Sequence, residues 1–248
     1  MKQQSLFAAN DLATQPLAYR VRPQTLADFA GQQQLLGKGK VLREIIESDQ
    51  LPSMIFWGPP GSGKTTLAEI IAKKTKAKFV TFSAVTSGIR DIRKLMKDAE
   101  ANRDMGGKTI DFVDEIHPFN KAQQDAFLPF VEKGSITLIG ATTENPSFEI
   151  NAALLSRCKV FVLQPLQVTD IIQLIKHALV HPDGFAKQHV EIDGEAIRQI
   201  AEFANGDARI ALNTLEMAVN NSEKSGDRIR VSTDNLHQLM ATKSFLYD

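Results

Sequence analysis

The sequence has a single cysteine and no long apolar run. Cys158 stands alone among 248 residues, which excludes an internal disulfide and is typical of a protein from a reducing cytosol. No apolar stretch reaches the roughly 18 residues that a membrane-spanning helix needs. The polar segment 1–10 lacks the apolar core of a signal peptide. These absences predict a cytoplasmic protein without a membrane partner.

The sequence also lacks an excess of charge of either sign. Its 29 basic and 29 acidic residues cancel, so the formal net charge at pH 7 is +0. Composition therefore does not predict a whole-molecule attraction to nucleic acid or anionic lipid, although a basic patch on one face stays open. The hydrophobic share of 43% suffices for a buried core in a chain of this length.

Short apolar segments alternate with helical patterns as far as Pro165. The predicted strands are 53–57, 78–83, 109–113, 135–141 and 157–163, with helical spacing between them at 64–76, 88–103 and 120–132. Apolar strands separated by helices are typical of a parallel sheet covered on both faces. We therefore expect an α/β fold with a parallel five-stranded sheet.

Helical patterns alone follow Pro165. They cover 169–179, 193–204, 207–221 and 233–240, which predicts a small helical lid domain. The residues before the sheet begin as a polar, aperiodic stretch. We expect a flexible N-terminal arm at 1–18, an α/β domain at 19–165 and the lid domain at 166–248.

A glycine-rich loop joins the first predicted strand to the next helix. It fits the pattern G-x-x-x-x-G-K-[ST] with Gly58, Pro59, Pro60, Gly61, Ser62, Gly63, Lys64 and Thr65. In such loops backbone N–H groups cradle phosphate oxygens at a helix N-terminus. We expect Lys64 to reach the β- and γ-phosphates of ATP, and Thr65 to ligate Mg²⁺, with Thr66 beside them. The alternative, a Gly-Pro turn that merely starts a helix, is disfavoured by the strand before the motif and the helix after it.

Two adjacent carboxylates end another predicted strand. Asp114 stands at the carboxyl end of strand 109–113, so we expect it beside the phosphate loop as a ligand for Mg²⁺. Glu115, one position on, is predicted to polarise the attacking water. Alternatively the pair is a solvated acidic strand end, a reading that the phosphate loop upstream makes less attractive.

Asp111 interrupts the same strand. An apolar side chain is expected there, because the sheet is predicted to be buried on both faces. Asp111 either meets a cation or a hydrogen-bond donor, or it faces a wetter surface. The sequence does not decide between these.

Several strings of residues carry a family resemblance. The phosphate loop, Asp114-Glu115, the strand at 138–145, Arg157 and Arg209 occur in the order found in AAA+ ATPases. The strings FVDEIH (112–117), NKAQQDAF (120–127), ATTENPSF (141–148) and NGDAR (205–209) resemble the RarA/MgsA family in particular. These are bacterial recombination-associated ATPases, similar to the eukaryotic Werner-helicase-interacting ATPase and related to clamp-loader subunits. The resemblance, from about residue 17 to 240, implies a nucleotide-binding AAA+ P-loop domain followed by a helical lid.

The resemblance implies roles for further residues. Thr143 matches the sensor-1 position that contacts the γ-phosphate, with Thr142 as its rival. Arg157 matches the arginine finger that reaches a neighbouring subunit's nucleotide, and Arg209 matches sensor 2. The segment 19–32 resembles the one that packs against adenine. The alternatives are an ordinary surface charge for Arg157 and a helix-start salt bridge for Arg209.

The chain departs from the family pattern on both sides of the carboxylates. Family members usually have an aliphatic residue in place of Asp111 and an arginine in place of Pro118. Pro118 also shortens the available helix start, because proline lacks an N–H. The chain ends at Asp248, before a helical region implicated in tetramer assembly in the family. The resemblance therefore implies a truncated form of a homo-oligomer assembled through a C-terminal region absent here.

Two functions compete at this point. The first is an AAA+ ATPase that binds and hydrolyses ATP with Mg²⁺ and acts on single-stranded or gapped DNA in replication-fork maintenance, recombination and repair. The rival is a clamp-loader-like binding module, which nucleotide occupancy switches and which has negligible turnover. Asp111, Pro118 and the missing C-terminal region favour the rival.

The N-terminal segment Gln3–Phe7 resembles the short peptide by which bacterial proteins dock on the replication sliding clamp. An apolar Leu6-Phe7 pair on a polar arm has no local core to join, which favours docking. A chance match is the alternative, since the string is short.

We predict that replacing Leu6 and Phe7 together with Ala eliminates clamp binding and leaves ATP binding unchanged, because the arm precedes the folded core. Such a peptide concentrates its binding energy in few buried anchors, so the wild-type affinity should be micromolar, about −8 kcal/mol. Calorimetry with purified clamp measures it. Equal binding by the wild type and the double variant would reduce the segment to a chance match.

Overall fold

The computed structural model describes residues 14–83, 88–222, 224–226, 228–233, 236 and 239–240. Its contacts divide the chain into two compact units, one of residues Pro23–Gln164 and one that joins the residues up to Arg22 to those from Pro165 onward. Each unit has a hydrophobic core of its own. The sliding-clamp segment Gln3–Phe7 lies outside the described residues.

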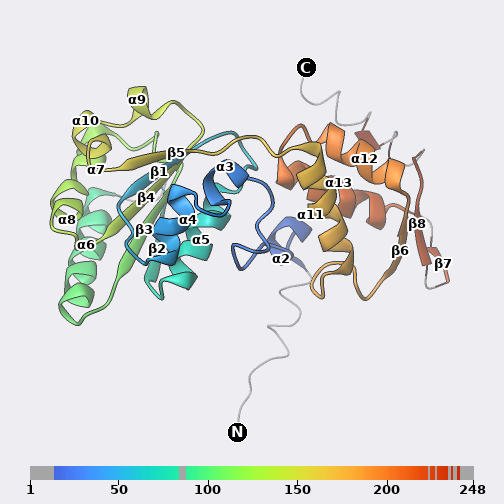
Figure 1. Ribbon diagram of the computed structural model, residues 1–248, viewed down its shortest axis with the longest axis horizontal. Coiled ribbons are helices and arrows are strands. Elements are labelled where there is room, and N and C mark those ends of the chain that lie inside the picture. Colours follow the sequence, from blue (N-terminus) through green and yellow to red (C-terminus); the bar gives the residue numbers. More distant parts are fainter. Residues whose placement is uncertain are drawn as a thin grey trace, which may run out of the picture. The chain divides into compact units, whose positions relative to one another are not determined.

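The unit Pro23–Gln164 is built on a parallel five-stranded sheet (Figure 1). Its strands are β1 (Met54–Trp57), β2 (Lys78–Ser83), β3 (Thr109–Asp114), β4 (Thr137–Thr142) and β5 (Lys159–Val162). They lie in the order β2-β3-β4-β1-β5. The structure confirms the predicted α/β fold.

Helices cover both faces of this sheet. They are α3 (Gln33–Leu36), α4 (Val41–Glu47), α5 (Lys64–Lys74), α6 (Ile89–Asp104), α7 (Lys121–Asp125), α8 (Leu128–Glu132), α9 (Pro146–Glu149) and α10 (Ala152–Leu155). Figure 1 shows α4 and α5 on one side of the strands and α6 to α8 on the other. Because successive side chains of a strand point to opposite faces, Phe112 packs with Leu67 of α5, whereas Val113 packs with Met96 of α6.

The predicted helix 120–132 is two helices in the structure. Asn120 caps α7 through its side chain, which accepts from Gln123 N–H in a reciprocal capping box. Pro129 stands in the first turn of α8, where a missing N–H is tolerated, but its ring is incompatible with a helix continuing from Asp125. Pro118 lies in the turn closed by Phe119 N–H and Ile116 C=O, so it precedes α7 and does not shorten it.

The second unit contains helices and a small sheet. Its elements are α2 (Leu17–Arg20), α11 (Val168–Val180), β6 (His189–Ile192), α12 (Gly194–Phe203), α13 (Ala208–Asn220), β7 (Lys224–Ser225) and β8 (Arg228–Val231). The predicted helices 169–179, 193–204 and 207–221 are present. The sheet, ordered β6-β8-β7, was not predicted, because its strands are too short for their alternation to stand out. Of the predicted helix 233–240, residues 233, 236, 239 and 240 are described and helical.

The segment Leu17–Arg22 belongs to the C-terminal unit. Leu17 and Val21 are buried in its core, and Leu17 N–H donates to Glu216 Oε2 of α13 (2.9 Å). Arg20 adds an ion pair with Glu216 at 2.7 Å. The predicted boundary at residues 18 and 19 therefore does not coincide with the division of contacts, because two apolar residues four apart complete a core that the rest of the chain builds about 150 residues later.

No helix within the described ranges is long and apolar enough to cross a membrane.

Asp111 is a buried carboxyl without full hydrogen bonding. It lies in β3 between Val80 of β2 and Leu138 of β4 and is 1% exposed, and its Oδ2 has no hydrogen-bond partner among the residues that the structure describes. Burial raises the pKa of Asp111 from 3.8 to about 7, and the positive charge of Lys78 offsets part of that rise. The structure thus excludes the wetter surface considered from the sequence.

This carboxyl makes stability depend on pH. Because the pKa of Asp111 is higher in the folded than in the unfolded chain, the folded chain binds the extra proton between pH 3.8 and about 7. The free energy of unfolding therefore falls as the pH rises through this interval, and the whole loss is present above about pH 7.

We predict that Asp111→Leu raises the free energy of unfolding by about 1–3 kcal/mol at pH 8, because it removes an unpaired buried polar group. Asp111→Asn, which removes only the charge, should stabilise at pH 8 and have little effect at pH 4. Urea unfolding at both pH values measures this, with Asp98→Asn on the exposed side of α6 as the matched control. A clear loss of stability in Asp111→Leu would mean that the carboxyl is satisfied.

Candidate functional site

The phosphate-loop motif forms the connection between β1 and α5. Gly61 and Gly63 have φ angles of 66° and 97°, which L side chains rarely adopt. A Cβ on Gly63 would lie 2.6 Å from Phe29 Cζ, and one on Gly58 would lie 2.4 Å from Leu163 O. The glycines are therefore required by the tight fit of this loop against its neighbours as well as by its turns.

The loop leads into an uncapped helix N-terminus. Gly63 is the N-cap of α5 and offers no side-chain hydrogen bond to the first turn, so these N–H groups and the helix dipole face the loop. Lys64 is 7% exposed, and its Nζ donates to Gly58 O (2.7 Å) and Pro59 O (3.0 Å). The ammonium group thus folds back over the loop. Backbone donors and a nearly buried cation at one place fit the phosphate groups of a nucleotide.

Gln32 braces this loop from outside the motif. Its Nε2 donates to Gln164 O (2.7 Å) and to Ser62 O (3.4 Å), and its Oε1 accepts from Gln164 N–H (3.0 Å). Gln32 is 5% exposed and has a φ of 54°. Sequence reasoning placed it only in a segment for adenine. Its supporting role was missed, and an isolated Gln gives no pattern that would have found it.

The segment 19–32, expected to pack against adenine, is divided between the two units. Tyr19 to Arg22 belong to the C-terminal unit and Pro23 to Gln32 to the other. Phe29 lies against Gly63 of the phosphate loop. The second half of the segment is therefore the part that adjoins the loop.

Thr65 and Asp114 form the pair expected for Mg²⁺. Thr65 Oγ1 donates to Asp114 Oδ2 at 3.4 Å, although the two residues belong to α5 and β3. Within the described residues, no group of three or more His, Cys, Asp or Glu side chains is placed to hold a metal. Two oxygen ligands beside a phosphate site suit Mg²⁺, which keeps several waters and binds through substrate phosphates. The residues present therefore fit this ion.

Asp114 and Glu115 lie where β3 turns away from β4. The regular pairing of the two strands ends at Val113 of β3 and Gly140 of β4. The next hydrogen bond between the two segments runs from Ile116 N–H to Ala141 O (2.8 Å). Glu115 has a φ of 52°, unusual for a residue with a side chain. Its Oε2 is shielded from solvent, while the side chain as a whole is 43% exposed. The exposed part of the side chain is therefore not Oε2.

The structure distinguishes the two candidate sensor threonines. Thr142 ends β4, is 0% exposed, and its Oγ1 lies 3.2 Å from His117 Nδ1 and accepts from Glu144 N–H (3.0 Å). Thr143 follows the strand, and its side chain forms no hydrogen bond with the described residues. Thr142 is thus linked to the acidic loop, and the position predicted first, Thr143, is not.

Arg157 is held by its own unit. Its Nη2 pairs with Glu132 Oε1 of α8 (2.5 Å), and its Nη1 donates to Ala153 O (2.6 Å). It precedes β5, whose first residue, Lys159, pairs with Met54 at the start of β1. The phosphate loop leaves the other end of β1. Arg157 therefore lies at the opposite end of the sheet from the phosphate loop of its own chain.

Arg209 stands in the first turn of α13 in the C-terminal unit. Its Nη2 lies 3.7 Å from Asp207 Oδ2, and Asp207 also caps the helix. The Arg209 side chain is 64% exposed. The helix-start salt bridge weighed from the sequence is therefore present, and among the described residues that long contact is the one that holds this exposed side chain to its unit.

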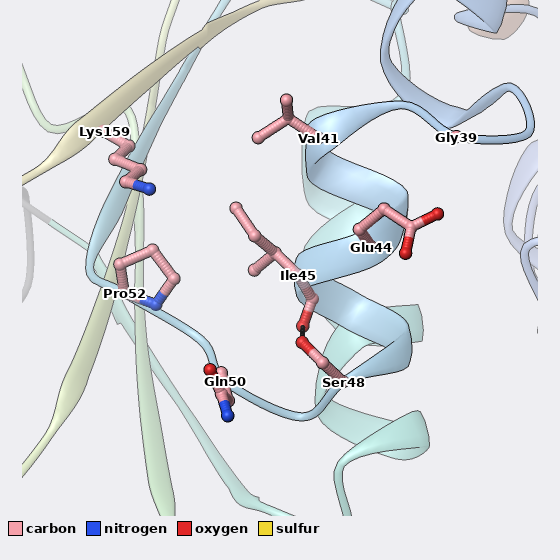
Figure 2. Close-up of a pocket in the computed structure, with 8 residues that line it drawn as sticks. All are labelled: Gly39, Val41, Glu44, Ile45, Ser48, Gln50, Pro52 and Lys159. Atoms are coloured by element: carbon pink, nitrogen blue, oxygen red, sulfur yellow. Dashed lines mark hydrogen bonds between the residues drawn. The ribbon is translucent and has the colours of Figure 1, made fainter.

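Cys158 and a surface groove lie apart from this site. Burial raises the pKa of the Cys158 thiol to about 12, so it stays protonated at neutral pH and is no nucleophile. The groove has a volume of about 450 Å³. Figure 2 shows the residues that line it, Gly39, Val41, Glu44, Ile45, Ser48, Gln50, Pro52 and Lys159. Pro52 precedes β1, so the groove adjoins the amino ends of the strands and contains none of the predicted site residues.

Two family matches cover parts of the two units. The AAA family, ATPase family associated with various cellular activities, matches residues 54–166, and the AAA C-terminal domain matches residues 186–248. The first match includes the phosphate loop, the two carboxylates and Arg157. The second includes Arg209.

Curated relatives are closely similar over the chain. Replication-associated recombination protein A of Escherichia coli (strain K12) is 50% identical over 96% of this chain and 54% of its own length. That of Coxiella burnetii is 56% identical over 82% and 46%, and the ATPase WRNIP1 of Dictyostelium discoideum is 48% identical over 82% and 23%. The chain thus spans about half the length of the bacterial relatives. It belongs to the AAA+ ATPases and, among them, to the family of replication-associated recombination protein A and WRNIP1.

Solved structures show the same fold. The Thermotoga maritima RuvB Holliday junction branch migration motor superposes with a TM-score of 0.72 and 26% identity, over 90% of this chain and 73% of that one. The predicted AAA+ fold is therefore confirmed.

We predict that Lys64→Ala abolishes ATP binding, because it removes the nearly buried cation that folds over the phosphate loop. Titration with a fluorescent ATP analogue measures the affinity. The matched control is Lys74→Ala, which removes an exposed lysine at the far end of α5 and should leave the affinity unchanged. Unchanged affinity in Lys64→Ala would contradict the assignment of the loop.

Proposed function

We propose that the chain binds ATP with Mg²⁺ at the phosphate loop and hydrolyses it, as the motor part of a protein that acts on DNA. The observation that carries this proposal is the contact of Thr65 with Asp114 beside the uncapped N-terminus of α5. It joins a phosphate cradle to a divalent-cation site. The position of Glu115 next to Asp114, with a side chain that is 43% exposed, supplies a general base for water.

Each residue of the site has a separate task in this proposal. The backbone N–H groups of 58–65 and the Lys64 ammonium bind the phosphates and offset their charge. Thr65 and Asp114 hold Mg²⁺, which when bound neutralises charge on the phosphate oxygens. Glu115 accepts a proton from water and orients that water. We propose Thr142, in place of Thr143, as the polar side chain that senses the state of this acidic loop, and its contact with His117 supports this choice.

The rival function, a nucleotide-switched module without turnover, receives less support. Asp111 lies on the sheet face that packs with α6, whereas the even-numbered residues of β3, Asp114 included, alternate to the face that packs with α5. Pro118 stands in a turn before α7. Asp111 therefore lowers the stability of the sheet and Pro118 fixes a turn, but neither departure from the family pattern replaces a site residue.

The DNA part of the proposal rests on the relatives. Their names place them in replication-associated recombination, and the RuvB structure is titled a Holliday junction branch migration motor. A net charge of zero means that contact with DNA would come from a local surface or an assembly rather than from whole-molecule attraction. We propose single-stranded or gapped DNA as the substrate and a homo-oligomer as the working form.

The test is ATP turnover by the purified chain with and without single-stranded or gapped DNA. We expect turnover that DNA stimulates.

Glu115→Gln should keep nucleotide affinity within about twofold and lower kcat by about 10²–10⁴-fold, since an amide cannot accept the proton of water. Phosphate release and nucleotide titration measure the two quantities. ATP binding without turnover in the wild type would instead support the nucleotide-switched module, and full turnover in Glu115→Gln would remove Glu115 from the role of base.

Arg157 is proposed to act on the nucleotide of a neighbouring subunit. Its place at the amino end of β5, away from its own phosphate loop, supports action in trans over action in cis. Arg209 is proposed as sensor 2, on the strength of its position at the start of α13 and the family order. An arginine placed on the charge of the transition state contributes on the order of 10³–10⁵ in rate.

We predict that Arg157→Ala spares nucleotide affinity in the isolated chain and suppresses turnover in the assembled protein. Mixing these subunits with Glu115→Gln subunits should restore part of the activity, because some interfaces then join an intact Glu115 to an intact Arg157. Turnover of the mixture, in oligomers shown to exchange subunits, is the measurement. The absence of any recovery would argue against action in trans.

A further inference from the structure

The acidic loop contains a histidine that neither the motif nor the family roles use. We propose that His117 is a positioning residue for Glu115, holding one carboxylate oxygen so that the other faces the water to be activated. The inference rests on the proposed ATP hydrolysis and adds a residue to the same site.

The contact is specific in its atoms. His117 Nδ1 lies 3.2 Å from Glu115 Oε2 and 3.2 Å from Thr142 Oγ1. Glu115 Oε2 is closed off from solvent and has no hydrogen-bond partner among the described residues, so the 3.2 Å approach of His117 Nδ1 is a close polar contact without hydrogen-bond geometry. A carboxylate oxygen without a donor is costly to shield from water. His117 Nδ1, whose hydrogen bond here is with Thr142 Oγ1, is the nearby group that would supply this donor on turning toward Oε2.

The chemistry fixes which form of the ring acts. A carboxylate has no proton to donate, so the contact is favourable only when His117 Nδ1 carries hydrogen. Thr142 then uses its hydroxyl hydrogen elsewhere, and Glu144 O lies within reach at 3.4 Å. The Thr142 oxygen is itself held by Glu144 N–H at 3.0 Å. His117 is thus supported from the end of β4.

The backbone sets this geometry in advance. Glu115 occupies a left-handed conformation, and Ile116 returns to β4 through its bond to Ala141. The turn from Ile116 to Phe119 follows at once, with Pro118 fixing its φ angle. A non-glycine residue held at positive φ requires surroundings that stabilise it. The loop therefore brings the side chains of residues 115 and 117 to the same side at a place where regular pairing has stopped.

The half-exposed carboxylate gives the arrangement its function. Glu115 is 43% exposed in its side chain and His117 27%, so the pair lies at the surface of the site rather than in the core. In the proposed arrangement, donation from His117 to Oε2 would keep the carboxylate in one orientation while Oε1 meets the water. Misplacement of a catalytic group by about 1 Å can lower a rate by about 10²-fold. Loss of the anchor should therefore appear in kcat and not in nucleotide affinity.

The experiment compares three substitutions in the full chain. His117→Ala removes the donor, His117→Leu removes it but keeps apolar bulk, and His117→Asn keeps an N–H group near the place of Nδ1. His189→Ala, an exposed histidine of β6, is the matched control. Steady-state ATP turnover gives kcat and KM, and titration with a fluorescent ATP analogue gives the affinity.

We expect kcat to fall about 10–100-fold in His117→Ala and His117→Leu, with affinity within about twofold of the wild type, and to recover most of its value in His117→Asn. Equal kcat in all variants, a rise of kcat in His117→Ala, or activity retained by Leu and lost with Asn would each overturn the proposal. A wild type that hydrolyses no ATP would instead count against the proposed function.

A second measurement distinguishes a failure of the His117–Glu115 proposal from a failure of the proposed ATP hydrolysis. In ¹⁵N-labelled protein, the Nδ1 resonance of His117 should shift when Glu115 is replaced by Gln, because the ring then faces an amide in place of a carboxylate. An unchanged resonance would overturn the contact, whatever the rate of turnover.

Discussion

The pairing of β1 with β4 is the constraint on which the site depends. These strands are separated by about 80 residues, yet their register joins Trp57 to Thr142, and Gly58 N–H continues the pairing by donating to Thr142 O (3.2 Å). The loop that leaves β1 therefore begins against the carboxyl end of β4. Because β3 lies on the other side of β4, Asp114 arrives at the same edge of the sheet. A slip of one residue in this register would turn every side chain of β4 to the opposite face.

The chemistry lies where regular structure stops. Gln32, Gly63 and Glu115 all have positive φ angles, and each adjoins the phosphate loop or the acidic pair. Backbone conformations of this kind persist only when surrounding contacts stabilise them. Here the contacts are the hydrogen bonds that the Gln32 side-chain amide donates to Gln164 and Ser62, the packing of Phe29 against Gly63, and the hydrogen bond from Ile116 N–H to β4. The site is thus built by a rigid sheet and a few strained connections.

The phosphate loop and the acidic pair are features that this chain shares with the AAA+ ATPases. Asp111 and Pro118 are two positions at which it departs from the family pattern. Asp111 places a carboxyl in an otherwise apolar strand, and the unfavourable burial is on the sheet face away from Asp114. Pro118 fixes the turn that brings His117 toward Glu115. One departure therefore bears on the stability of the sheet and the other on the geometry of the acidic loop.

The sequence by itself determined the type of sheet, the phosphate loop and the acidic pair. Each of these is encoded locally: apolar runs of strand length, a spaced set of Gly, Lys and Thr, and two carboxylates directly after Val113. Local patterns fix local structure, so they can be read without knowing what packs against them. The helix break at Pro129 was also encoded locally, and the prediction missed it by following the apolar pattern across it.

Only the tertiary structure decided the partners that come from far along the chain. Leu17 and Val21 fill the core of the C-terminal unit, Gln32 braces the loop through Gln164, and Thr142 rather than Thr143 meets the acidic loop. No periodicity marks these residues, because each contact is made by a single side chain whose role depends on strand register and on a turn elsewhere. The position of His117 beside Glu115 is of the same kind: the sequence places the two residues close together, and only the bend of the backbone after β3 brings Nδ1 to the carboxylate.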